Sequence, residues 1–116
     1  QRYEEGLADW AARSGVRLPI VPEYCQQAFH MFYVLMPSLD DRTRLIERLR
    51  EMGILSVFHY LPLNLSAVGR RHGGHPGQCP VAEDVSDRLL RLPFYASLTP
   101  ALQDEVIDGI VSFACG

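Results

Sequence analysis

The side chains best suited to chemistry in this sequence are histidines and tyrosines at the ends of apolar segments. His59 and Tyr60 directly follow the apolar run 54–58, which predicts a short buried strand. An imidazole and a phenol can both donate and accept hydrogen bonds at the edge of a cleft. Comparable places in or beside two other predicted strands are taken by His30, Tyr33 and Tyr95. Each of these residues alone is more often structural, and only their repetition indicates a ligand-binding surface.

Two other groupings could do chemistry, and both are incomplete. His72, His75 and Cys79 are zinc-ligand types, but a structural zinc site needs four ligands and paired spacing. A glycine-rich loop that happens to contain histidines explains them better, so no metal is expected. A cysteine–histidine nucleophilic pair has no third group to orient it. We therefore predict no catalytic residue in this chain.

Composition bounds the class of protein. The chain has 116 residues, of which 47% are hydrophobic and 22% charged, as expected for one globular domain. A net charge of −3 argues against a nucleic-acid or anionic-membrane partner. No apolar run is long enough to cross a bilayer, and no secretion signal is visible. The three scattered cysteines favour free thiols in the cytoplasm.

All 11 basic residues are arginine, so chemistry that needs a lysine amine cannot be done by this chain alone. The sequence begins without methionine, inside a helical pattern. Together these features predict a fragment of a longer protein whose first helix, at 1–14, is truncated. Such a helix would leave Tyr3 and Trp10 short of packing partners.

The elements that must position these side chains follow from periodicity and from helix-capping residues. Ser38 and Thr99 are expected N-caps, and Gly15 and Gly53 are expected helix ends. The expected order is a helix at 1–14, strand 29–36, helix 38–52, strand 54–59, a mobile surface loop at 69–78, helix 80–90, a short strand at 89–92 and helix 99–114. This order predicts an α+β domain, in which a small three-stranded sheet packs with about four helices.

Four segments then make the sequence recognisable: His30–Leu35, Asp41–Thr43, Val57–Leu63 and Ser86–Pro93. In this order and spacing they resemble the C-terminal small domain of the DegT/DnrJ/EryC1/StrS sugar aminotransferases, over essentially the whole chain 1–116. The resemblance implies a fold-type I enzyme that uses pyridoxal 5′-phosphate and is a homodimer at full length. The cofactor's lysine would lie in an N-terminal domain, so this chain alone should be inactive.

The closest resemblance is to enzymes that convert dTDP-4-oxo-6-deoxy-D-glucose to a dTDP-4-amino-4,6-dideoxyhexose, with L-glutamate as amino donor. It implies substrate-binding roles for His59 and Tyr60, which match the family's His-Tyr-x-Pro-Leu-His signature, and for His30. Asn64 replaces the last histidine of that signature, so it keeps a donor and an acceptor but cannot titrate. The alternative is a stand-alone α+β ligand-binding or regulatory module.

Overall fold

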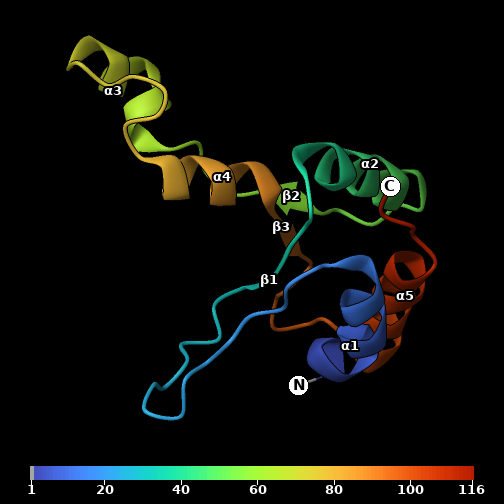
Figure 1. The fold of residues 1–116 in the computed structure, drawn as a ribbon. Coiled ribbons are helices and arrows are strands. Elements are labelled where there is room, and N and C mark those ends of the chain that lie inside the picture. Colours follow the sequence, from blue (N-terminus) through green and yellow to red (C-terminus); the bar gives the residue numbers. More distant parts are fainter. Residues whose placement is uncertain (1) are drawn as a thin grey trace.

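A three-stranded antiparallel sheet with helices packed against one face forms the body of the chain (Figure 1). The computed structural model describes residues 2–116. Its elements are α1 (Arg2–Ser14), β1 (Phe32–Leu35), α2 (Leu39–Glu51), β2 (Val57–Phe58), the 3₁₀ turn η1 (Leu63–Leu65), α3 (Ala67–Arg71), α4 (Pro80–Arg88), β3 (Leu89–Leu92) and α5 (Pro100–Val111). The predicted α+β class is confirmed, with five α-helices in these residues where about four were expected.

The register of the sheet places one charged side chain at its centre. The strand order is β1-β3-β2, and Arg91 on the central strand lies opposite Tyr33 and Val57. Directly opposed residues share a face, and neighbouring residues alternate between faces. Leu90 therefore points into the core, where it is fully buried. Arg91 belongs to the opposite face of the sheet.

Helix α1 completes the core by packing against α5 (Figure 1). The Trp10 indole donates a hydrogen bond of 2.8 Å to the Phe113 carbonyl. The Tyr3 hydroxyl donates one of 2.9 Å to the Pro93 carbonyl, and burial raises the pKa of this phenol. The expectation that Tyr3 and Trp10 lack partners is wrong, because α5 and the segment after β3 cover them.

Capping residues set the helix boundaries as predicted. The side chains of Ser38 and Thr99 accept hydrogen bonds from the amides of Asp41 and Leu102. Gly15 and Gly53 follow α1 and α2 with φ of +67° and +77°, a conformation in which glycine carries no steric penalty. Helix α5 ends at Val111, three residues earlier than expected. No helix within residues 2–116 has the length and apolar character needed to cross a membrane.

Two strand predictions need correction. The first strand begins at Phe32 rather than at position 29, because Phe29 adopts a left-handed φ of +47° that breaks an extended chain. The second strand is only Val57–Phe58, and these side chains are 41% and 50% exposed. The predicted buried strand at 54–59 is therefore wrong. Strand β2 lies at the sheet edge and pairs with β3 alone.

Residues 61–79, which we call the arm, project away from the body (Figure 1). The prediction of a mobile loop at 69–78 missed regular structure here, since α3 occupies 67–71 and η1 precedes it. Helix α4 leads back from the arm and passes directly into β3, since Arg88 ends the helix and Leu89 begins the strand. The arm is thus attached to the central strand of the sheet.

Replacing Ser38 with alanine will test the cap of α2. The Ser38 hydroxyl accepts from the Asp41 amide at 3.0 Å and donates to the Asp41 carboxylate at 2.7 Å. Loss of an N-cap hydroxyl costs about 1 kcal/mol of stability. We expect a matching fall in the free energy of unfolding in urea. The control S97A, at an exposed position, should unfold like the wild type; equal midpoints for all three proteins would contradict the cap.

Candidate functional site

Two hollows lie on either side of Arg91. The first, which we call the Tyr60 groove, has a volume of about 490 Å³ and is lined by Phe58, His59, Tyr60, Leu61, Leu63 and Arg91. The second, which we call the His30 pocket, has a volume of about 420 Å³. Apolar side chains from the ends of α2 and α5 line much of it, together with the polar groups of His30, Arg91, Tyr95 and Glu105. Three predicted ligand-binding residues therefore lie in two hollows that share one arginine.

His59 and Tyr60 form one wall of the Tyr60 groove. Their rings meet edge to face, with centroids 4.9 Å apart. Tyr60 is 77% exposed, so its hydroxyl is available to a ligand. The Nδ1 atom of His59 is buried and has no hydrogen-bond partner within residues 2–116. A buried polar atom without a partner is unusual and marks a place where a bound group could form a bond.

Helices α2 and α4 hold this wall from behind. The Ser86 hydroxyl on α4 donates a 2.9 Å hydrogen bond to the Tyr60 carbonyl. Arg42 on α2 donates to the Ser86 carbonyl at 3.3 Å, and its guanidinium carbon lies 5.4 Å from the centre of the Phe58 ring. The backbone at 58–60 is therefore fixed by side chains of two helices although it lies at a sheet edge.

Arg91 is the functional candidate that sequence reasoning missed. It is half-buried on the central strand, and no hydrogen bond or ion pair involves its guanidinium within the described part of the chain. The available signal was a lone charged residue within the apolar strand 89–92. Such a residue must face away from the core, and an arginine there offers a fork of donors to an anionic oxygen.

Asn64 does not lie with the other predicted residues. It is absent from the lining of both hollows. Its Nδ2 atom donates to the His75 carbonyl at 3.0 Å and to Glu83 Oε1 at 2.7 Å. These bonds tie Asn64 into the arm. A direct role of Asn64 in substrate binding stays a prediction that no contact here tests.

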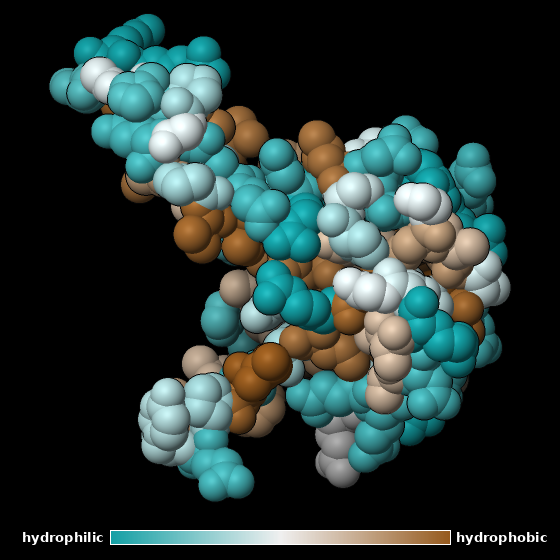
Figure 2. Space-filling view, in the orientation of Figure 1, coloured by the Kyte–Doolittle hydropathy of each residue, from teal (hydrophilic) through white to brown (hydrophobic). Residues whose placement is uncertain are grey.

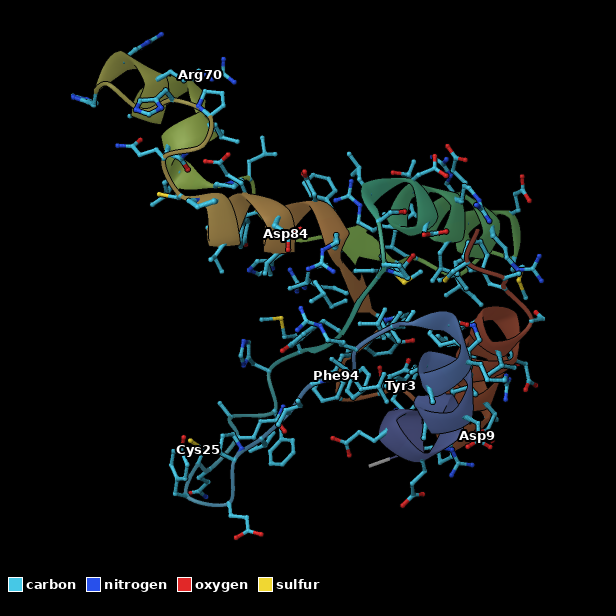
Figure 3. The ribbon with its side chains drawn as sticks, in the orientation of Figure 1. Tyr3, Asp9, Cys25, Arg70, Asp84 and Phe94 are labelled. Atoms are coloured by element: carbon cyan, nitrogen blue, oxygen red, sulfur yellow. The ribbon has the colours of Figure 1, made fainter. Side chains whose placement is uncertain are left out.

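Within residues 2–116, no group of three or more histidine, cysteine or acidic side chains is arranged to hold a metal ion. The three cysteines are unpaired. Cys25 lies in the extended loop after α1, far from Arg70 in the arm (Figure 3).

Surface polarity separates the tip of the arm from its base. Figure 2 shows hydrophilic surface over the tip and hydrophobic surface where the arm joins the body. Arg70 lies at the tip, and Asp84 lies on α4 near the base (Figure 3). Exposed apolar residues at the base include Leu61 and Leu63, which are 63% and 85% exposed. Exposed apolar side chains that gather in one place favour a contact with a ligand or with another part of a protein.

Solved structures define the class of protein. The chain aligns with a DegT DnrJ EryC1 StrS aminotransferase from Brucella abortus at 32% identity and a TM-score of 0.76, over 94% of this chain and 27% of that one. It aligns with the putative sugar aminotransferase Spr1654 from Streptococcus pneumoniae, in its PMP form, at 25% identity and a TM-score of 0.82, over 93% of this chain and 27% of that one. The fold is therefore that of a domain found in aminotransferases.

Sequence comparison gives the family. Residues 1–111 match the DegT/DnrJ/EryC1/StrS aminotransferase family, and the chain belongs to it. One relative, a dTDP-3-amino-3,4,6-trideoxy-alpha-D-glucose transaminase from Micromonospora megalomicea subsp. nigra, is 34% identical over 95% of this chain and 29% of its own length. Another, the erythromycin biosynthesis sensory transduction protein EryC1 from Saccharopolyspora erythraea, is 31% identical over 92% of this chain and 28% of its own length. The chain thus spans less than a third of either relative.

A glycine substitution will test whether the arm is a folded unit. A Cβ atom at Gly69 would lie 1.8 Å from the Leu63 carbonyl oxygen, so G69A must force the arm apart. Overpacking of this kind costs about 1–3 kcal/mol. We expect faster proteolysis between residues 63 and 79, read by mass spectrometry. The control H72A changes an exposed side chain of the arm that makes no hydrogen bond in the described residues, and it should leave the cleavage pattern unchanged. Resistance of G69A equal to wild type would show that the arm is not closely packed.

Proposed function

We propose that the chain is the C-terminal domain of a pyridoxal-phosphate-dependent transaminase that acts on dTDP-4-oxo-6-deoxy-D-glucose. L-glutamate would be the amino donor, and the full-length protein a homodimer in the cytoplasm. The observation that carries this proposal is the relative from Micromonospora, a dTDP-aminosugar transaminase that matches 95% of the chain. The groove lined by His59, Tyr60 and Arg91 supports it, because its groups suit a polar anion.

The chemistry of a nucleotide sugar fits these side chains. Its diphosphate carries negative charge, which the guanidinium of Arg91 can bind through paired N–H donors. Its hydroxyls can bond to the exposed Tyr60 phenol, beside the His59 ring that lines the same groove. His30 lines the second hollow on the other side of Arg91 and would extend the same polar surface. These residues bind and orient the substrate, and none of them is assigned a proton transfer.

The lysine that bonds to the cofactor would lie in the rest of the protein. The chain contains no lysine, so it cannot supply an amine to bond covalently to the cofactor. Pyridoxal phosphate, known in the family, would supply the electron sink for amino transfer from the rest of the protein.

The position of the amino group distinguishes two substrates. The Micromonospora relative is named for an amino group at carbon 3, whereas the resemblance points to carbon 4. We therefore also consider a 3-oxo substrate as the second candidate. The name of the relative EryC1 describes a sensory transduction protein, which is consistent with the alternative that this domain is a ligand-binding or regulatory module.

Activity of the full-length protein will test the proposal directly. With pyridoxal phosphate and L-glutamate, it should convert dTDP-4-oxo-6-deoxy-D-glucose to an amino sugar, identified by mass spectrometry and by the position of the new C–N bond in NMR. The dTDP-3-oxo-4,6-dideoxy sugar, the ketone that corresponds to the relative's amino sugar, should turn over more slowly. Preference for this 3-oxo sugar would select the second candidate. Binding of dTDP-sugars with no turnover of either ketone would favour the regulatory alternative.

Substitution of Arg91 will test the binding surface. R91A removes a charged donor from the proposed diphosphate contact, and a hydrogen bond to a charged group contributes about 1.5–3 kcal/mol. We expect the KM for the nucleotide sugar to rise about tenfold or more, while kcat changes little. R91K should recover only part of the loss, because lysine lacks the planar fork. The control R50A removes an exposed arginine on α2. A KM in R91A equal to that in R50A would remove Arg91 from the site.

A further inference from the structure

One carboxylate at the base of the arm joins its two sides. Glu83, on α4, accepts hydrogen bonds from the amides of Gly77 and Cys79, with shortest distances of 2.8 and 3.1 Å. The same side chain accepts from Asn64 Nδ2 at 2.7 Å. Asn64 lies on the outgoing side of the arm, and Gly77 and Cys79 lie on the returning side. Glu83 therefore bonds to both sides at once.

Close packing within the arm gives these bonds a defined frame. The backbone at Gly69 lies against the Leu63 carbonyl, and a Cβ atom at Gly74 would lie 2.3 Å from the Asn64 carbonyl oxygen. The amides of Gly69 and Gly74 are bonded to the Ser66 hydroxyl and to the Gly69 carbonyl, at 3.0 and 2.9 Å. Two glycines here permit close approach of backbones. These backbone contacts within the arm therefore fix the position of Asn64.

Helix α4 is also hydrogen-bonded, through Ser86, to the segment that lines the Tyr60 groove. Ser86 lies three residues after Glu83, so the two side chains project on the same side of the helix. Ser86 donates to the Tyr60 carbonyl, and Glu83 accepts from Asn64. The segment between these anchors, 61–63, contributes Leu61 and Leu63 to the Tyr60 groove. The same helix continues into β3, which carries Arg91 at the other side of that groove.

We propose that Glu83 is a positioning residue. The hydrogen bonds that it makes with Asn64 and with the amides of Gly77 and Cys79, which we call the clasp, hold segment 61–63 of the Tyr60 groove at a fixed place relative to Arg91. Glu83 does not touch the substrate. This inference rests on the proposed function for the identity of the ligand, and it assigns Asn64 a role in the frame of the groove.

The charge of Glu83 matters to the clasp. The amides of Gly77 and Cys79, followed by Asn64 and the nearby His75, hold the pKa of this carboxyl below its usual value. A depressed pKa means that the clasp is complete above the ordinary carboxyl pKa of about 4.3 and weakens as the pH falls through the lowered value.

Hydrogen exchange and kinetics on the full-length protein will test the clasp. The variants are E83Q, which removes the charge, and N64A, which removes the donor on the opposite side. The matched control is D84N, because Asp84 is the next carboxylate along α4 and pairs with Arg88 outside the arm. We expect E83Q and N64A to speed amide exchange in residues 72–79 about tenfold or more, with α5 unchanged. We expect D84N to exchange like the wild type.

The kinetic readout separates positioning from mere stability. E83Q and N64A should raise the KM for the dTDP-sugar about fivefold or more while kcat stays within about twofold. Unchanged exchange in both variants would overturn the clasp. Faster exchange with an unchanged KM would overturn the positioning role. If E83Q also speeds exchange in α5, the test rests on N64A, which leaves the carboxylate charged. Amide exchange and the KM for the dTDP-sugar in N64A then show whether the clasp positions the groove.

The two proposals fail in different ways. A wild-type protein that does not transaminate refutes the proposed function, while the exchange data still decide the clasp. A wild-type protein that transaminates, with variants that exchange and turn over like D84N, refutes the clasp and leaves the proposed function intact.

Discussion

The direct passage of α4 into β3 is the constraint on which the rest of the structure depends. The helix ends at Arg88 and the strand begins at Leu89, with no residue between them. This junction is bonded to the end of β1, because the Met36 amide donates to the Arg88 carbonyl at 3.0 Å and Arg88 Nη1 donates to the Met36 carbonyl at 3.3 Å. Since β3 is the central strand, both edge strands take their places from it. The direction of α4, and with it the arm, is then set by the core.

Alternation along β3 places a charged side chain on the face of the sheet opposite the core. Leu90 and Leu92 are 0% and 5% exposed and belong to the core, so Arg91 between them must lie on the other face. Burial of the two leucines contributes about 1.5–3 kcal/mol each, which holds the strand in register. A one-residue slip would drive the guanidinium into the core at a large desolvation cost. The hydrophobic core therefore fixes the place of Arg91 between its two hollows.

Local signals in the sequence could predict the parts of the fold that local interactions determine. Ser38 and Thr99 act on amides three residues away, so their caps were predictable. The apolar run 54–58 predicted a buried strand, but burial depends on what lies beside the strand, and β2 lies at the sheet edge. Two of the four glycines of 69–78 permit close backbone contacts, which their residue type alone did not indicate. The bond between Glu83 and Asn64 joins residues 19 apart in the sequence, so no local pattern predicted it.

The two hydrogen bonds of Asn64 show how the order of the arm constrains substitution. One nitrogen of Asn64 carries two N–H donors, and these serve the His75 carbonyl and Glu83 together. A neutral histidine carries a single N–H, so it could satisfy only one of these acceptors. The carbonyl and carboxylate left without a partner would then have to bond to water or move. Position 64 is therefore coupled to position 83 through the Asn64 side-chain amide. A change at either residue would shift segment 61–63 of the Tyr60 groove without removing a direct contact to a ligand.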